Sequence, residues 1–156
     1  GEGHVISAAN ACLTHDAAAF LQLSSQPSAF KLIDVVEVAG DPQRSPLMVV
    51  TASQVLLAQH GLGMADMTAI EWNEAFAVID GLFETHYPDL LDRYNIFGGA
   101  LAYGHPFGAS AAIILLHLMK ALEIKEGRYG LAAIPAAGGQ GIAFLVEYNQ
   151  EWFNAN

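Results

Sequence analysis

The chain has 156 residues, of which 53% are hydrophobic and only 14% are charged. This length suits one domain with its own core, and the composition is too apolar for a disordered segment. Sixteen acidic against six basic residues give a net charge of −10, which disfavours a nucleic-acid partner and is expected to serve solubility.

The first third of the chain predicts two strands. They are expected at His4–Ala8 and at Leu32–Val38, where β-branched residues partly alternate before a Gly-Asp-Pro turn. Asp16–Leu23 stays ambiguous, because its alanines favour a helix while its shortness permits a buried strand.

A helix and a short strand are predicted next. Ser45 before Pro46 is typical of an N-cap with proline at the first helical position. The helix would run to about His60, with Gly61 just beyond its end. A strand is then expected at Thr68–Trp72.

Apolar residues recur at helical spacing from Trp72 to Tyr87 and predict an amphipathic helix stopped by Pro88. Tyr87 to Asn95 then forms a polar and aromatic connection with room for a helical turn.

The segment Phe107–Ile124 predicts a helix that is apolar over most of its circumference. Such a helix is normally buried on more than one side. A sheet could cover only one face, so the helix requires a second layer that the remaining elements of this chain cannot supply. Its longest apolar run, Ala111–Leu116, is far shorter than the ~20 residues of a membrane-spanning helix, so no membrane span is expected.

Tyr129–Ile134 and Ile142–Tyr148 predict two strands joined by a glycine-rich turn. With helices between the middle strands, the whole pattern favours an α/β protein with a mixed sheet. No shift in composition marks a linker, so we expect one domain.

His105 lies in Gly104-His105-Pro106-Phe107-Gly108, a constrained loop that leads straight into a helix. A lone His-Pro would be interpreted as a structural turn. Here the helix start favours negative charge nearby, which suits a base acting on a thiol or an enolate. We therefore favour a functional role for His105.

Two further stretches are candidate site segments. Asn73 sits where a strand gives way to a helix, and it could be an ordinary N-cap, a neutral donor to a water or oxyanion, or both. Gly138-Gly139-Gln140-Gly141 could be a simple hairpin turn, or a backbone that approaches a thioester closely.

Cys12 is the single cysteine of the chain, so it forms no internal disulfide. His15 lies three residues away, but a cysteine in such apolar surroundings is more often an inert small hydrophobe. No cysteine and histidine pair has the spacing of zinc ligands, so no metal is expected. A reducing, cytoplasmic setting is expected.

Taken together, Asn73–Phe76, Gly104–Ala109 and Gly138–Glu147 resemble the motifs of the carboxy-terminal half of the thiolases, the acyl-CoA acyltransferases. The resemblance extends from about Val5 to Glu147. The residues around Tyr103 are most similar to those of the long-chain 3-ketoacyl-CoA thiolase branch.

The resemblance implies one half of a five-layer αβαβα sandwich, in which residues 1–156 form a mixed sheet of about five strands with helices on both faces. The amino-terminal half, or a second subunit that carries the nucleophilic cysteine, would be the partner. The parent would be a homo-oligomer. Acyl-coenzyme A would be the substrate, with no covalently bound cofactor.

The resemblance also assigns roles to residues. His105 would activate the nucleophilic cysteine, and Asn73 would support an oxyanion through a water. Cys12 and Leu13 would lie near the pantetheine of coenzyme A, and the turn at Gly138 and Gly139 would shape the thioester pocket.

One departure bears on activity: Pro135 stands where the second catalytic cysteine is expected, and Ala137 replaces a glycine of the second oxyanion hole. Proline has no exchangeable proton. Losing a positioned acid or base costs ~10²–10⁴ in rate. The chain is therefore expected to be inactive by itself and its parent impaired. A non-catalytic thiolase-like binding or assembly module is the alternative.

Overall fold

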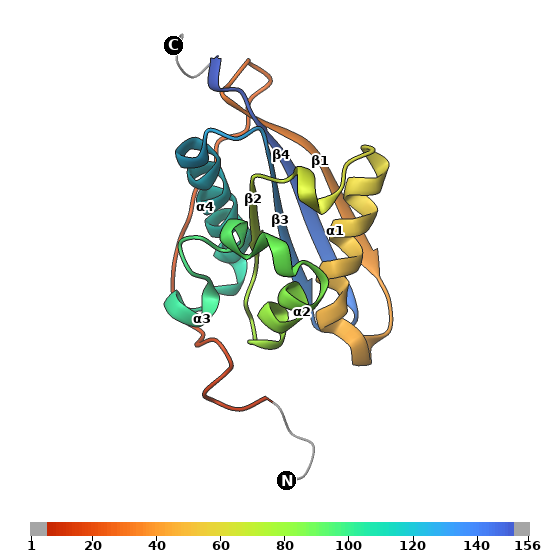
Figure 1. Cartoon of the computed structure of the whole chain (residues 1–156). Helices are drawn as coiled ribbons and strands as arrows, with labels where there is room; N and C mark the ends of the chain where they lie inside the picture. Colours follow the sequence, from red (N-terminus) through yellow and green to blue (C-terminus); the bar gives the residue numbers. More distant parts are fainter. Residues whose placement is uncertain (1–5, 152–156) are drawn as a thin grey trace.

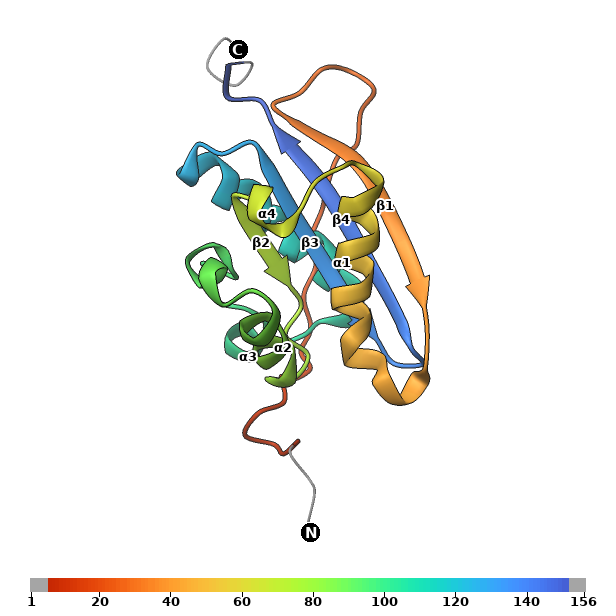
Figure 2. The same cartoon turned by 45° about the vertical axis from the view of Figure 1, so that its right-hand side comes forward.

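The computed structural model describes residues 6–151. Four strands form one mixed sheet in the order β1-β4-β3-β2, with helices on both faces, as Figures 1 and 2 show. The strands are β1 (Phe30–Ala39), β2 (Ala69–Trp72), β3 (Tyr129–Ala136) and β4 (Gln140–Tyr148). β4 is antiparallel to both β1 and β3, whereas β2 is parallel to β3. The expected α/β fold with a mixed sheet is confirmed.

The sheet has four strands where about five were expected, and the described residues add two isolated bridges, Ala11 with Phe76 and Ile70 with Tyr94. Beside β2, Tyr94 forms a single parallel bridge with Ile70, and the Asn95 N–H donates to the Ile70 carbonyl at 2.9 Å. The chain reaches this position from a 3₁₀ helix, η3 (Pro88–Arg93), and turns away at Gly98, whose φ is +76°. This segment is joined to β2 by a single bridge rather than a ladder, so it does not count as a strand.

One face of the sheet is covered by α1 (Met48–Gln59) and α2 (Val78–His86). Its core is strongly aromatic: Trp72 meets Phe83 edge-on at 5.0 Å, and Phe83 stacks on Tyr94 at 4.0 Å between centroids. Such rings contribute large buried apolar areas, so this face is a well-packed core.

The opposite face is covered by α4 (Ser110–Lys125), which follows the short helices α3 (Ala100–Tyr103) and η4 (Phe107–Ala109). A stripe of α4 that includes Leu118 is buried against the sheet. On its outer side Leu116 and Ile124 are 40% and 58% exposed. The structure therefore confirms an apolar helix of which only one side is covered within this chain.

Phe107–Lys125 is the one helix among the described residues that is long and apolar enough to cross a membrane. Length and composition alone are weak support for a membrane span, because core helices meet the same criterion. Only 28% of this helical window is buried within the chain, although the helix packs on the sheet. One side of this apolar helix thus belongs to the core, and its other side is left uncovered within the described residues.

The region of Ser45 differs from the prediction. Pro42–Leu47 form a 3₁₀ helix, η1, whose N-cap is Asp41; its carboxylate accepts from the Gln43 N–H at 2.9 Å. Ser45 is therefore not an N-cap; its hydroxyl instead accepts from the Gly139 N–H at 2.9 Å. Two prolines so close together lack the N–H groups that an α-helical turn would need.

The end of α1 agrees with the prediction from the sequence, whereas the amino-terminal segment does not. Gly61 has a φ of +65° and follows the last helical turn as predicted. The strand expected at His4–Ala8 is wrong in its described part, since residues 6–8 form no strand and residues 4 and 5 lie outside the described residues. Asp16–Leu23 is neither helix nor strand, and Phe20 is 89% exposed.

Candidate active site

His105 lies on the loop between α3 and η4, and the structure holds it at two points. The backbone N–H of His105 donates to the Leu13 carbonyl at 2.7 Å. The ring Nδ1 lies 2.6 Å from the Ser110 hydroxyl in the first turn of α4. Partial burial lowers the pKa of His105. When Nδ1 is the donor to the Ser110 hydroxyl, Nε2 of the neutral imidazole is left to accept a proton, which is the state a general base requires.

The backbone beside His105 depends on Gly104. Its φ is +95°, and a Cβ at this position would overlap the imidazole of His15. Only glycine combines this φ with such a close approach. His15 thus packs beneath the His105 loop, and its Nδ1 lies 3.0 Å from the Asp16 carbonyl.

Asn73 follows β2 and continues its pairing, because its N–H donates to the Ala133 carbonyl at 2.9 Å. The N-cap of α2 is Ala77, so the ordinary capping role considered for Asn73 is wrong. Asn73 is only 2% exposed, and its Nδ2 has no hydrogen-bond partner among residues 6–151. A buried amide donor without a partner is costly, so it is suited to hold a small polar group.

Glu74 and Asn95 form a buried pair that sequence reasoning missed. The Asn95 side chain clamps both backbone groups of Trp72 at 3.0 Å and donates to the Glu74 carboxylate at 2.6 Å. A Cβ at Gly99 would overlap that carboxylate, which explains a glycine there. Two signals were available: Glu74 lies within the Asn73–Phe76 motif, and Asn95 lies shortly before the Gly98-Gly99 pair.

A groove of about 640 Å³ opens beside His105. It brings together three predicted site residues, Cys12, His105 and Gly138, whereas Asn73, Leu13 and Gly139 are not among its lining residues. Its walls are mainly apolar, and they include residues of η1 that sequence reasoning did not assign to the site. The main apolar walls come from Pro42, Pro46, Phe76, Ile79, Phe107, Ile134 and Pro135.

The remaining predicted residues border this groove without lining it. Gly139 has a φ of +77°, and its carbonyl accepts from the Gly40 N–H at 2.7 Å, so the β3–β4 turn is fastened to the residue that follows β1. Leu13 is held by its carbonyl contact with His105. The Cys12 N–H donates to the Ala75 carbonyl at 3.1 Å, and burial raises the pKa of its thiol. Cys12 is therefore a protonated thiol rather than a ready nucleophile.

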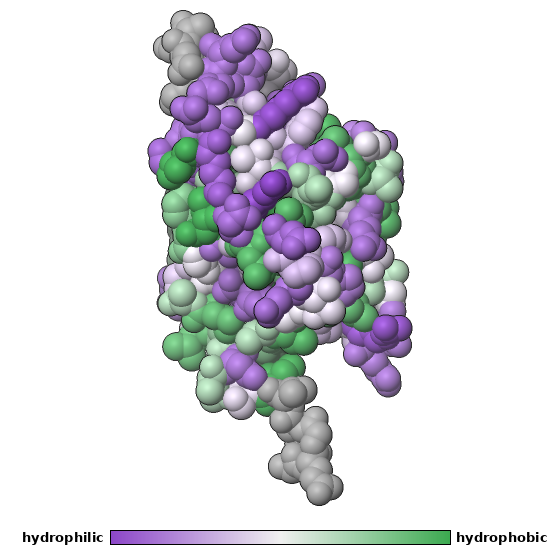
Figure 3. All heavy atoms as spheres, viewed as in Figure 1, coloured by the Kyte–Doolittle hydropathy of each residue, from purple (hydrophilic) through white to green (hydrophobic). Residues whose placement is uncertain are grey.

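Pro135 lies on β3 opposite Gly141 and forms part of the groove wall. Phe107 covers the mouth, with its ring 4.9 Å from that of His105 and 70% of the residue exposed. In the space-filling view of Figure 3, apolar surface gathers at the lower left, over α3 and the start of α4. The site thus opens next to apolar surface.

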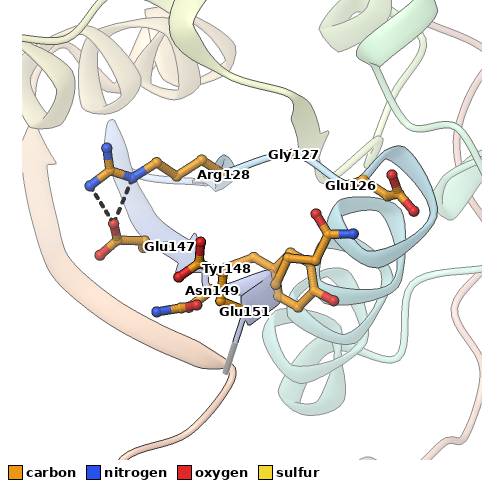
Figure 4. Close-up of a pocket in the computed structure, with 8 residues that line it drawn as sticks. Glu126, Gly127, Arg128, Glu147, Tyr148, Asn149 and Glu151 are labelled. Atoms are coloured by element: carbon orange, nitrogen blue, oxygen red, sulfur yellow. Dashed lines mark hydrogen bonds and ion pairs between the residues drawn. The ribbon is translucent and has the colours of Figure 1, made fainter. Parts of the chain in front are cut away.

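A second hollow, shown in Figure 4, lies at the opposite end of β4. There Arg128 pairs with Glu147 at 2.7 Å and lies over the ring of Tyr129 at 4.6 Å. Both charged side chains are solvent-accessible, so this pair contributes little free energy. Within residues 6–151 no group of three or more potential ligands is placed to hold a metal ion.

Comparison with known proteins agrees with this architecture. Residues 26–148 match the family model described as the thiolase C-terminal domain. This chain belongs to the thiolase family. An acetyl-CoA acetyltransferase of Synechocystis sp. is 40% identical over 152 residues, which is 92% of this chain and 38% of the relative.

Two other similar proteins show the same partial coverage. The mitochondrial trifunctional enzyme subunit beta of Rattus norvegicus is 34% identical, with 93% of this chain and 36% of that protein covered. The human mitochondrial 3-ketoacyl-CoA thiolase structure matches with a TM-score of 0.74 and 31% identity over 79% of this chain and 31% of that chain. This thiolase chain spans less than two fifths of the length of these relatives.

Proposed function

We propose that this chain is the carboxy-terminal half of an acyl-CoA acyltransferase and completes an active site with an amino-terminal half that carries the nucleophilic cysteine. The observation that carries the proposal is the His105 loop beside an apolar groove. The imidazole is kept neutral by burial and oriented by Ser110. The relatives are more than twice as long as this chain, which leaves room for that other half.

In the proposed reaction, Nε2 of His105 removes the thiol proton of the partner's cysteine. The thiolate attacks the thioester carbonyl, and a water held on Asn73 stabilises the oxyanion that forms on the carbonyl oxygen. Coenzyme A then leaves as a thiol, because His105 returns the proton to its sulfur. The unpartnered Nδ2 of Asn73 supports its part in this step.

Pro135 limits what the parent can do. Forming or cleaving the carbon–carbon bond requires a group that exchanges a proton at the α-carbon of the thioester. Pro135 has no such group. Cys12 is the one thiol among the residues that line the groove, and its backbone N–H donates to the Ala75 carbonyl. We propose acyl transfer to the partner's cysteine without efficient 3-ketoacyl-CoA thiolysis or condensation.

The test is to join the chain to its amino-terminal half and assay acetoacetyl-CoA thiolysis. Pro135→Cys should raise kcat by ~10²-fold or more, because it supplies the missing acid/base thiol. Pro135→Ala is the matched control, which restores a backbone N–H but adds no ionisable group, and it should not raise kcat. Rapid thiolysis with Pro135 intact would defeat the proposed limitation.

The second candidate function is a non-catalytic module that keeps the fold as a binding or assembly surface. It is favoured by Pro135 and by the small number of ionisable side chains in the groove. In this case His105→Ala should leave partner binding and cellular function intact. Loss of both on that substitution, with the fold retained, would exclude the module.

A further inference from the structure

The carboxylate of Glu74 joins three segments of the chain. Glu74 directly follows Asn73 and is only 7% exposed. Its Oε1 accepts from the Asn95 side chain at 2.6 Å, and its Oε2 accepts from the Leu101 N–H at 3.3 Å. Leu101 is the second residue of α3, so one side chain links the end of β2 to the helix that leads to His105.

The helix α3 passes this contact on to His105 over a short stretch of chain. It is a single turn of four residues, and the Gly104 N–H closes it by donating to the Ala100 carbonyl at 2.8 Å. His105 follows at the next position. A closed helical turn moves as a unit, so a shift at Leu101 is expected to displace His105 as well.

The backbone at Cys12 and Leu13 makes a second connection between the same two segments. The Cys12 N–H donates to the Ala75 carbonyl at 3.1 Å, and the Leu13 carbonyl accepts from the His105 N–H at 2.7 Å. These links use main-chain atoms, which side-chain substitutions leave in place. Glu74 makes its link through a side chain, so its contribution can be removed on its own.

The partners of Glu74 explain why a carboxylate stands at this position. The Asn95 amide is fixed in orientation, because its oxygen accepts from the Trp72 N–H and its nitrogen donates to the Trp72 carbonyl, both at 3.0 Å. Asn95 therefore offers Glu74 a donor, and the Leu101 N–H is a donor too. A carboxylate accepts at both oxygens, whereas the glutamine of Glu74→Gln would set its NH₂ group against one of these donors. This substitution breaks the link with little change in shape.

We propose that Glu74 is a positioning residue that holds the His105 loop in place relative to Asn73. A displacement of about 1 Å in a catalytic arrangement can cost ~10²-fold in rate, so Glu74 acts on the reaction without touching the substrate. The choice of Asn73 and His105 as the groups to be held rests on the proposed function.

Amide hydrogen exchange of the chain, followed by mass spectrometry, tests the link itself. Glu74→Gln should speed exchange by roughly tenfold or more in a peptide that covers α3 and His105, and should change the β4 peptide by less than about twofold. Val50→Ala is the control, because it truncates a buried side chain of α1 that does not line the groove. It lowers global stability and should speed exchange in β4 at least as much as in α3. Equal acceleration of both peptides by Glu74→Gln, or none at α3, would overturn the proposal.

Glu74→Asp is a second variant, which keeps two acceptor oxygens on a side chain that is one methylene shorter. Its carboxylate should no longer reach the Leu101 N–H, so exchange should again be faster at α3 and His105 than in the wild type. Exchange at the wild-type rate in that peptide would also overturn the proposed link.

The effect on catalysis is measured after the chain is joined to its amino-terminal half. Exchange of the acetyl group between acetyl-CoA and labelled coenzyme A reports acyl transfer without carbon–carbon chemistry. Glu74→Gln should lower kcat by roughly tenfold or more and change KM by less than about twofold, because the groove stays intact while the catalytic geometry is lost. An unchanged kcat, or a rise in KM alone, would exclude the positioning role. No transfer by the wild type would instead defeat the proposed function, while hydrogen exchange would still decide the link.

Discussion

The two faces of the sheet differ in how completely they are covered. On the first face, α1 and α2 enclose an aromatic cluster around Trp72 and Phe83, and both of these residues are almost fully buried. On the second face, α4 covers β2 and β3 but leaves its own outer side chains, such as Ile124, exposed. The first face is a finished core, whereas the helix on the second face leaves apolar side chains uncovered within the described residues.

The largest effect is expected from truncating the finished core. Phe83→Ala removes a fully buried ring that contacts Trp72 and Tyr94, and it should lower the free energy of unfolding by about 3–5 kcal/mol. Urea denaturation monitored by circular dichroism measures this loss. Ile124→Ala is the control on the second face and should cost less than about 1 kcal/mol. Equal losses would mean that the two faces do not differ as described.

The next effect concerns Glu71, which is buried beneath α4. Its pKa is raised from 4.5 to about 8, chiefly by burial. A carboxyl group whose pKa is higher in the folded than in the unfolded chain favours folding at a pH below its unfolded-state pKa. This contribution is lost as the pH rises from that pKa towards 8. At pH 8, Glu71→Gln should therefore be more stable than the wild type by a few kcal/mol, on the order expected from such a shift. At pH 4 the two proteins should hardly differ.

Urea midpoints of wild type and Glu71→Gln across this pH range provide the measurement. The difference between the two proteins isolates Glu71, because all other titrating groups are shared. A difference that does not grow with pH would show that Glu71 ionises as easily in the folded chain as in the unfolded one.

Two glycines give a smaller and opposite pair of effects. Gly99→Ala would push a methyl group into the Glu74 carboxylate, and it should destabilise the chain by about 1–3 kcal/mol. Gly81→Ala lies in α2 with no atom within 4 Å of the added carbon, and it should stabilise by about 0.5–1 kcal/mol. Thermal unfolding of both variants checks the sign, and destabilisation by Gly81→Ala would contradict the packing described for the first face.

The smallest effect in the chain itself is expected on the outer side of α4. Leu116→Gln should change the unfolding free energy by no more than about 0.5 kcal/mol, because Leu116 is 40% exposed. In the proposed parent protein the same change should weaken the contact between the two halves, since it would place an amide in the layer proposed to lie between them. Co-purification with the amino-terminal half measures this second effect. An undiminished complex would place the partner elsewhere.

Local patterns predicted the regular elements well. The strand around Leu32–Val38, the helix ending before Gly61 and the hairpin of β3 and β4 all follow from periodicity and turn residues, and the structure has them. Local rules failed at the two capping residues. Both Ser45 and Asn73 have good N-cap chemistry, but the helices begin at Met48 and Val78. In each case a contact with a distant strand or turn prevailed over the local preference.

The amino-acid sequence by itself determined the family motifs, the α/β alternation and the apolar helix that requires two covered sides, because these features depend on residues close together in the chain. Only the tertiary structure decided which groups meet at the site. The Ser45 hydroxyl binds the Gly139 N–H across 94 residues, and Asn95 clamps Trp72 across 23. Such contacts depend on how strands and loops converge in space, and no local pattern in the chain encodes that convergence.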